Sequence, residues 1–323
     1  MTAPDTLARR PSLPVPMIID TDPGVDDAFA IVTALCSPEV DVRAVVATYG
    51  NVGREQTFVN LRRILALAGR TDIPAAAGAI RPLVHPQAET APDWHGIDGL
   101  GLHADEFPEP GPADPRQGVE LMADTLLAAE APVTLVCLGP FTDAALLLAT
   151  RPDLVPRLGR IVAMGGSFGA GNTRGAGEFN VYADPEAAHR VLTQRDVPVT
   201  LVPLDVTMAA RVDGAWLDDL AAAGPRVEVL VRTTRLYRDT FVERHGHDSV
   251  ALHDTLAVLE AVVPGSLRTT PFPLAVACSQ GAERGVTVID RRDEAGGAPV
   301  AVAFDADVAA VTAEVGRRVR ALG

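Results

Sequence analysis

Short apolar, β-branched segments alternate with longer amphipathic segments along most of the chain. Five short segments lack alternating polar positions, as is typical of parallel strands covered on both faces, and they span 15–19, 42–48, 133–138, 160–164 and 199–203. The longer segments have helical spacing of apolar residues and span 26–35, 54–68, 119–129, 144–149 and 185–193. This alternation predicts an α/β fold, a Rossmann-like, doubly wound and mostly parallel sheet with flanking helices.

The remaining segments bear on domain organisation. Residues 227–243 and 306–322 predict two further helices, and residues 82–115, rich in Pro, Gly and His, predict a long loop of the kind that often carries function. We find no internal repeat and no dividing linker, so residues 14–323 are expected to form a single domain. Residues 1–13 are interpreted as a disordered leader, because prolines follow Arg9 and Arg10 where a signal peptide would be apolar.

Composition and charge narrow the function. The net charge of −14 argues against binding to a nucleic-acid polymer, while a small neutral substrate or a bound cation remains compatible. The apolar runs are too short to span a membrane. The sequence contains no lysine, which excludes Schiff-base chemistry, a P-loop lysine and a Ser–Lys dyad. Three widely spaced cysteines fit a reducing compartment, so we expect a cytoplasmic protein.

Gly and polar residues follow four of the predicted strands, where ligands bind in open α/β sheets. The first of these segments holds Asp20, Asp22, Asp26 and Asp27, four carboxylates that repel one another unless a cation lies among them. An all-oxygen set favours a hard ion such as Ca²⁺ or Mg²⁺. Alternatively, Asp26 and Asp27 only stabilise a helix N-terminus, although that leaves Asp20 and Asp22 without an explanation.

Several motifs, in order along the chain, resemble those of the inosine–uridine-type nucleoside hydrolase family. The segment 20–28, DTDPGVDDA, resembles the family's signature, and residues 164–166, Asn172 and 178–188 resemble its central block. His253 and Asp254 within 251–255 resemble its C-terminal block. Three other segments also fit in order: Asn51, 95–96 and 138–140. The match spans roughly residues 17 to 265, with departures at Asp143, where Asn is common, and Thr255, where Pro is common.

The resemblance implies a Ca²⁺ site and a ribose site. The implied Ca²⁺ ligands are Asp22, Asp27, Asp254 and the backbone carbonyl of Leu138, and water and ribose hydroxyls would complete the 6–8 oxygens that Ca²⁺ prefers. The residues implied to bind substrate are Asp26, Asn51, Met164, Asn172, Glu178, Asn180 and Asp254. Asp20 is interpreted as support behind the acidic loop.

The implied reaction is hydrolysis of the N-glycosidic bond of ribonucleosides to ribose and free base, a step in nucleoside catabolism and salvage. Asp22 would act as the base that activates water, since Ca²⁺ acidifies water less than zinc does. His253, with His95 second, would assist protonation of the leaving base, although a lone histidine is more often structural. The two histidines resemble pyrimidine-preferring or broad-specificity members, and Tyr237 is a weaker candidate for contact with the base. The family also implies a homodimer or homotetramer.

Two alternatives remain. Asp20 and Asp22 have the Asp-x-Asp spacing of haloacid-dehalogenase-like phosphohydrolases, although Gly24 and the absence of lysine do not fit that pattern. The chain could also be a non-catalytic, Ca²⁺-dependent ribose-binding or nucleoside-binding protein. The presence of both Asp22 and His253 argues against this second alternative, because binding alone needs neither a base nor an acid.

Overall fold

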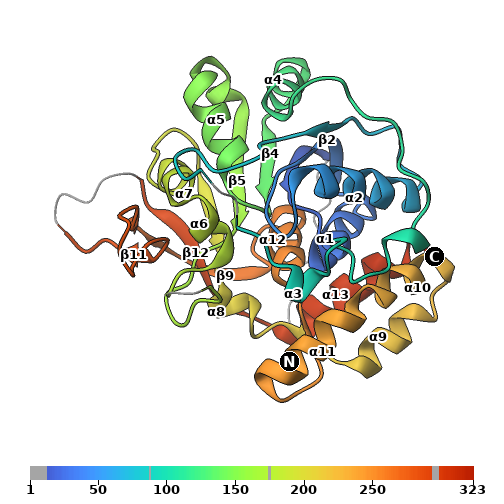
Figure 1. Ribbon diagram of the computed structural model, residues 1–323. Coiled ribbons are helices and arrows are strands. Elements are labelled where there is room, and N and C mark those ends of the chain that lie inside the picture. The colour runs from blue at the N-terminus through green and yellow to red at the C-terminus, as the bar shows by residue number, and fades with distance from the viewer. Residues whose placement is uncertain (1–12, 87–88, 174–175, 293–297) are drawn as a thin grey trace, which may run out of the picture.

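An eight-stranded sheet forms the centre of the molecule in the computed structural model, which describes residues 13–86, 89–173, 176–292 and 298–323 (Figure 1). The strand order is β3-β2-β1-β4-β5-β6-β12-β9, and all neighbours are parallel except β12 and β9. The strands are β1 (Val15–Thr21), β2 (Val40–Ala47), β3 (Ala75–Ala77), β4 (Val133–Cys137), β5 (Leu158–Met164), β6 (Val199–Val202), β9 (Leu267–Phe272) and β12 (Val300–Ala306). The expected leader falls on residues 1–12, outside the described residues, and on Leu13.

Helices cover both faces of this sheet, because successive side chains of each strand point to opposite sides. In β1, Met17 and Ile19 belong to one apolar cluster and Ile18 belongs to the other. The first cluster includes residues of α1 (Val25–Leu35), α2 (Arg54–Leu67), α9 (Gly214–Ala221), α10 (Pro225–Arg232), α11 (Thr234–His245), α12 (His253–Val262) and α13 (Val308–Arg320). The second includes residues of α4 (Gly118–Ala128), α5 (Thr142–Thr150) and α7 (Pro185–Leu192).

Shorter elements connect these layers. They are α3 (Pro92–His95), α6 (Phe179–Ala183), α8 (Leu204–Thr207) and the 3-10 helices η1 (Ala104–Glu106) and η2 (Pro152–Arg157). Two small antiparallel pairs join β7 (Arg211–Val212) to β8 (Val250–Ala251) and β10 (Leu274–Val276) to β11 (Thr287–Ile289). Among the described residues, no helix has the length and apolar character that crossing a membrane requires.

The predicted α/β fold with a mostly parallel sheet and flanking helices is confirmed. The prediction of one helix over 227–243 is wrong, because α10 ends at Arg232 and α11 begins at Thr234. The hydroxyls of Thr233 and Thr234 donate to the carbonyls of Leu230 and Val231, each at 2.7 Å, and such local side-chain bonds compete with the helical pattern.

The C-terminal helix α13 is attached to the segment between α1 and β2 by a buried arginine. The side chain of Arg318 is 1% exposed. Its guanidinium donates to Ser37 Oγ at 2.5 Å, to both carboxyl oxygens of Glu39 at 2.8 and 3.0 Å, and to Glu314 Oε1 at 2.9 Å. Since hydrogen bonds to charged groups contribute more than neutral ones, this residue holds the end of the chain against the sheet.

We therefore expect Arg318→Leu to lower the free energy of unfolding by about 2–3 kcal/mol, because Leu keeps the packing volume but removes the donor to Ser37 and Glu39. Arg317→Leu is the matched control, since Arg317 also pairs with Glu314 but its side chain is 61% exposed. That change should cost less than about 0.5 kcal/mol. Urea denaturation of both variants measures the difference, and similar small losses in both would contradict the role of Arg318.

Candidate active site

The carboxyl ends of the central strands bring the predicted site residues to one edge of the sheet. Asp22 follows β1, Asn51 follows β2, Leu138 follows β4, and Met164 ends β5. Figure 1 shows α1, α12 and α3 close together in the middle of the molecule beyond this edge. Because α1 and α12 lie in contact, Asp27 and Asp254, which are 227 positions apart in the sequence, meet here.

The acidic loop places Asp26 and Asp27 in the first turn of α1, and α12 contributes Asp254 from its own first turn. One carboxylate oxygen from each of these three residues lies within 4.8 Å of the others. Asp27 is held by the backbone N–H of Gly24 and the Asn51 side-chain amide, both at 2.9 Å, and it also accepts a hydrogen bond from Thr21. These bonds fix the Asp27 carboxylate, next to which the carboxylates of Asp26 and Asp254 lie.

Asp22 lies outside this tight group, in a narrow space between two glycines. A Cβ atom on Gly50 would lie 1.9 Å from its Oδ2 atom, and one on Gly139 would lie 2.7 Å from its Oδ1 atom. The backbone N–H of Asn51 donates to Oδ2 at 2.8 Å, and the Asn51 side chain donates to the Asp22 carbonyl at 3.0 Å. Glycine at both positions is what permits this approach, and it orients the Asp22 carboxylate.

Burial dominates the electrostatics of this acidic cluster. It raises the pKa of Asp26 to about 8, with a further contribution from Asp27. Burial, followed by the charges of Asp27 and Asp26, raises the pKa of Asp22 well above its usual value, and the same holds for Asp254 next to Asp26 and Asp27. Buried carboxylates that repel one another this strongly form a set that fits a hard divalent cation, which prefers oxygen ligands.

A second group of predicted residues lies beside the acidic cluster and is built around Glu178. Glu178 caps α6 by accepting hydrogen bonds from the N–H groups of Asn180 and Val181, at 2.9 and 3.1 Å, and it also accepts from Gly166 N at 2.9 Å. Burial raises the pKa of Glu178 to about 7. Asn172 accepts from the backbone of Phe179 at 2.9 Å, which fixes the start of α6.

Asn180 connects this second group to the strand ends. Its amide nitrogen donates to the carbonyl of Leu138 at 2.6 Å and to the carbonyl of Met164 at 3.2 Å. The Leu138 carbonyl, a candidate metal ligand, therefore already accepts one hydrogen bond, and its second lone pair remains for another partner. Asp184 is the N-cap of α7, since its side chain accepts from Ala187 N at the start of that helix.

Two buried histidines lie near the acidic cluster. His95 Nδ1 accepts a hydrogen bond from the backbone N–H of Val25 at 3.1 Å, so its proton is on Nε2. His253 Nδ1 lies 2.7 Å from Thr207 Oγ1, and its Nε2 lies 3.3 Å from the Tyr237 hydroxyl. Burial lowers the pKa of His95 to about 3, with His253 contributing, and burial lowers that of His253 to about 4. Both imidazoles are therefore neutral near pH 7.

Two residues of this histidine environment were missed or underestimated in the sequence. Thr207 carries no motif, and its contact with His253 joins residues 46 positions apart. Tyr237 is a weak candidate for base contact in the sequence, and the structure places its hydroxyl next to His253 and its ring edge-on to His95, with ring centroids 6.0 Å apart. An aromatic position on an amphipathic helix gives no sign in the sequence of the partner it will meet.

Asp20 faces away from the acidic cluster, towards α5. Asp20 is buried, and neither of its carboxyl oxygens makes a hydrogen bond to a described residue. The backbone of Ala144 is the nearby group that favours the charged form of this carboxyl. Burial and the charge of Asp143 raise its pKa well above the usual value. Asp143 accepts from Ala79 N at 2.8 Å, and burial raises its pKa to about 6.

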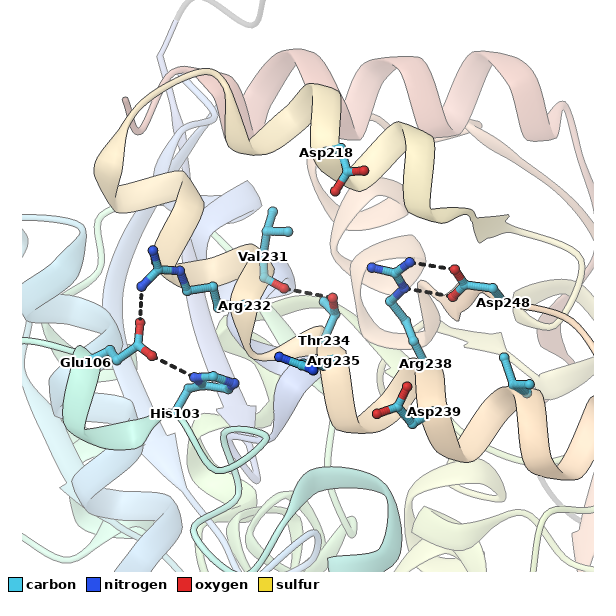
Figure 2. Close-up of a pocket in the computed structure, with 11 residues that line it drawn as sticks. His103, Glu106, Asp218, Val231, Arg232, Thr234, Arg235, Arg238, Asp239 and Asp248 are labelled. Atoms are coloured by element: carbon cyan, nitrogen blue, oxygen red, sulfur yellow. Dashed lines mark hydrogen bonds and ion pairs between the residues drawn. The ribbon is translucent and has the colours of Figure 1, made fainter.

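A separate open cleft of about 660 Å³, the outer cleft, is lined by residues of α9, α10 and α11, by His103 and Glu106, and by Asp248 (Figure 2). Its arginines are largely paired with acids, since Arg232 bonds to Glu106 at 2.8 Å and Arg238 bonds to Asp248. None of the residues predicted for the catalytic site lines this cleft. Helix α11 therefore divides two environments, with Tyr237 directed at the histidines and Arg238 at the outer cleft.

Comparison with known proteins agrees with this arrangement. The family model described as inosine-uridine preferring nucleoside hydrolase matches residues 17–313. The pyrimidine-specific ribonucleoside hydrolase RihA of Salmonella agona (strain SL483) is 40% identical over 283 residues, which cover 85% of this chain and 88% of the relative. RihA of Escherichia coli O127:H6 (strain E2348/69 / EPEC) is also 40% identical, over 282 residues, with the same coverage.

Solved structures give the same result. A plant nucleoside hydrolase, the PpNRh1 enzyme, superposes with a TM-score of 0.87 at 31% identity and covers 95% of this chain and 99% of its own. A purine-preferring ribonucleoside hydrolase from Gardnerella vaginalis superposes with a TM-score of 0.88 at 29% identity, and the alignment covers 95% of this chain and 98% of that one. The fold is thus that of these enzymes.

The buried Asp20–Asp143 pair generates a stability prediction. Because the folded-state pKa of Asp143 is about 6, above an unfolded value of about 4, the folded protein loses stability as the pH rises through this window. Asp143→Asn removes this ionisation and keeps an oxygen for Ala79 N. We expect the variant to gain about 2 kcal/mol of unfolding free energy at pH 8 and much less at pH 4, measured by urea denaturation. An equal gain at both pH values would show that ionisation of Asp143 is not the cause.

Proposed function

The chain belongs to the inosine–uridine preferring nucleoside hydrolase family, whose members hydrolyse the N-glycosidic bond of ribonucleosides, and we propose that it prefers pyrimidine nucleosides and uses Ca²⁺. The observation that carries the proposed base preference is a pair of buried neutral histidines. His95 is bonded to the acidic loop, and His253 is bonded to Tyr237. The relatives named pyrimidine-specific, at 40% identity over most of the chain, support the base preference.

The proposed Ca²⁺ ligands are Asp22, Asp27, Asp254 and the carbonyl of Leu138. The oxygen-only set, its burial and the 4.8 Å grouping that includes Asp27 and Asp254 support this assignment. When bound, the ion supplies charge neutralisation among the carboxylates and a fixed orientation for water and sugar hydroxyls. Asp26 shares the same grouping, and we assign it to a ribose hydroxyl because it also lies towards His95, with Oδ1 3.9 Å from Nδ1.

In the proposed reaction, a water attacks C1′ of the ribose while the bond from C1′ to the base nitrogen breaks. Asp22 accepts the proton of this water, because Asn51 N and the two flanking glycines hold its carboxylate in one orientation. Asn51, Asn172 and Asn180 hold the sugar hydroxyls, and Met164 lines the same side. Positive charge grows on the ribose in the transition state, and the carboxylates of Asp26 and Glu178 stabilise it.

The leaving base takes up negative charge, and the histidines are placed to stabilise it. His95 presents an Nε2–H group, since its Nδ1 accepts from Val25. His253, next to Tyr237, supplies another hydrogen-bonding group, and Thr207 holds its imidazole ring at Nδ1. Neutral N–H donors suit the carbonyl oxygens of a departing pyrimidine, on which the negative charge is delocalised. We assign His253 as the main group and His95 as the second.

The two alternatives are not favoured. The nucleoside hydrolase family model matches residues 17–313, so the Asp-x-Asp spacing of Asp20 and Asp22 does not indicate a phosphohydrolase. Asp20 also lies towards Asp143 rather than towards the acidic cluster. A purely ribose-binding protein would have no need for the bonded pair of Tyr237 and His253. The expected homodimer or homotetramer and the cytoplasmic location stay predictions.

Hydrolysis of uridine, cytidine, inosine, adenosine and guanosine, followed by release of reducing sugar, tests the proposal. We expect kcat/KM for uridine and cytidine to exceed that for the purine nucleosides by at least about tenfold. A chelator should lower the uridine rate by about 100-fold or more, and added Ca²⁺ should restore it. A rate that does not respond to the chelator would overturn the metal assignment, and equal rates on all five nucleosides would overturn the base preference.

Substitution of His253 tests the leaving-group role. We expect His253→Ala to lower kcat on uridine by about 100-fold or more, and kcat on nitrophenyl riboside by less than about threefold, because an activated leaving group needs little assistance. His189→Ala is the control, since His189 is exposed on α7 and has no proposed role. Equal losses on both substrates in His253→Ala would contradict the assignment.

A further inference from the structure

We propose that Asn60 is a positioning residue that sets the orientation of His95 relative to the acidic loop. The Asn60 side chain donates hydrogen bonds to the acidic loop, at Pro23, and to the segment that follows His95, at Asp98. This inference rests on the proposed function, in which His95 donates to the leaving base.

Asn60 lies in α2 and is completely buried. Its amide nitrogen donates to the carbonyl of Pro23 at 3.1 Å and to the carbonyl of Asp98 at 2.8 Å. Its amide oxygen accepts from Gln56 Nε2 at 2.9 Å. Both amide hydrogens are therefore used, one for each carbonyl, and the donor from Gln56 agrees with this orientation of the amide.

Hydrogen bonds join α2, the acidic loop and the segment 95–98 to one another around His95. Pro23 lies two residues before Val25, whose backbone N–H donates to His95 Nδ1 at 3.1 Å. Asp98 lies three residues after His95. Asn60 thus holds the backbone on each side of the hydrogen bond that orients the imidazole. Without its amide, the two segments lose their common anchor.

Two glycines allow this close approach. Gly99 has a φ of +78°, and a Cβ there would lie 2.6 Å from Asn60 Nδ2 and 3.4 Å from the Pro23 carbonyl oxygen. A Cβ on Gly24 would lie 2.5 Å from His95 Nδ1. Side chains at either position would therefore force the segments apart, so the backbone is shaped for contact at this point.

Hydrogen bonds within residues 95–104 hold this segment together, so the bond from Asn60 to the Asp98 carbonyl positions all of it. The carboxylate of Asp98 accepts from the backbone N–H groups of Leu100, Leu102 and Ala104, at 3.0, 2.9 and 2.9 Å. The N–H of Gly101 donates to the carbonyl of His95 at 2.8 Å. A displacement at the Asp98 carbonyl is therefore carried to the imidazole, and a shift of about 1 Å in a catalytic group can cost about 100-fold in rate.

The test compares uridine with nitrophenyl riboside in Asn60→Leu, which keeps the size of the side chain but cannot donate. We expect kcat on uridine to fall by roughly 30- to 100-fold and kcat on nitrophenyl riboside to fall by less than roughly threefold. A residue with a merely structural role would lower both rates together. Asn60→Ala, which also lacks the donor, is the second variant in case Asn60→Leu fails to fold, and it should show the same selectivity.

Thr57→Val is the matched control on the same helix. Thr57 is buried one turn before Asn60, and its hydroxyl donates to the Thr48 carbonyl at 2.7 Å, so the variant loses a buried hydrogen bond without touching Pro23 or Asp98. Its two rates should keep their wild-type ratio, and its melting temperature shows how much a comparable loss of stability contributes.

The variant His95→Ala distinguishes the proposed role of His95 from the inference about Asn60. If His95→Ala is selective for uridine but the Asn60 variants lower both rates equally or not at all, the inference about Asn60 is overturned and the proposed function stands. If His95→Ala lowers both rates equally, the proposed role of His95 is overturned, and the inference falls with it. Selective loss in both supports the inference.

Discussion

The constraint on which the rest of the site depends is the burial of four carboxylates beyond the end of β1. Asp22, Asp26, Asp27 and Asp254 are each no more than 5% exposed, so water does little to offset their mutual repulsion. Two helices begin at this point, and the positive ends of α1 and α12 partly offset the negative charge. The remaining repulsion is what a divalent cation would relieve, which links the stability of the loop to its proposed chemistry.

That constraint explains several residues around the cluster. Gly50 and Gly139 leave room for the Asp22 carboxylate, and Asn51 bonds to both Asp22 and Asp27. Asn180 reaches the Leu138 carbonyl from the opposite side, and Glu178 fixes the backbone that carries Asn180. Gly50, Asn51 and Gly139 restrict the acidic cluster directly, whereas Asn180 and Glu178 fix the Leu138 carbonyl next to it.

The sequence predicts the features that depend on local pattern, and it misses those that depend on packing between distant segments. The buried strands and the acidic loop are local, because apolar runs and a carboxylate cluster are visible without the fold. Helix α12 was not predicted, since residues 254–262 are all buried and a helix that is buried on every side shows no clear apolar face in the sequence. Asn60 resembles any polar residue of an amphipathic helix, and only the fold brings it to Pro23 and Asp98.

The two sides of the site are held in different ways, and this bears on how the preference for a base is set. The acidic side is fixed by many short contacts among strand ends. The side that we propose faces the base is held by packing of α3 on α11. There the ring centroids of Trp94 and Tyr237 lie 5.0 Å apart, and Arg244 stacks on Trp94 and bonds to Asp93. Apart from His95, which contacts the acidic loop, changes in α3 and α11 are therefore expected to act on the groups proposed to face the base rather than on the acidic cluster. We infer that the acidic loop defines the reaction of the family, while the packing of these two helices decides which nucleoside this chain accepts.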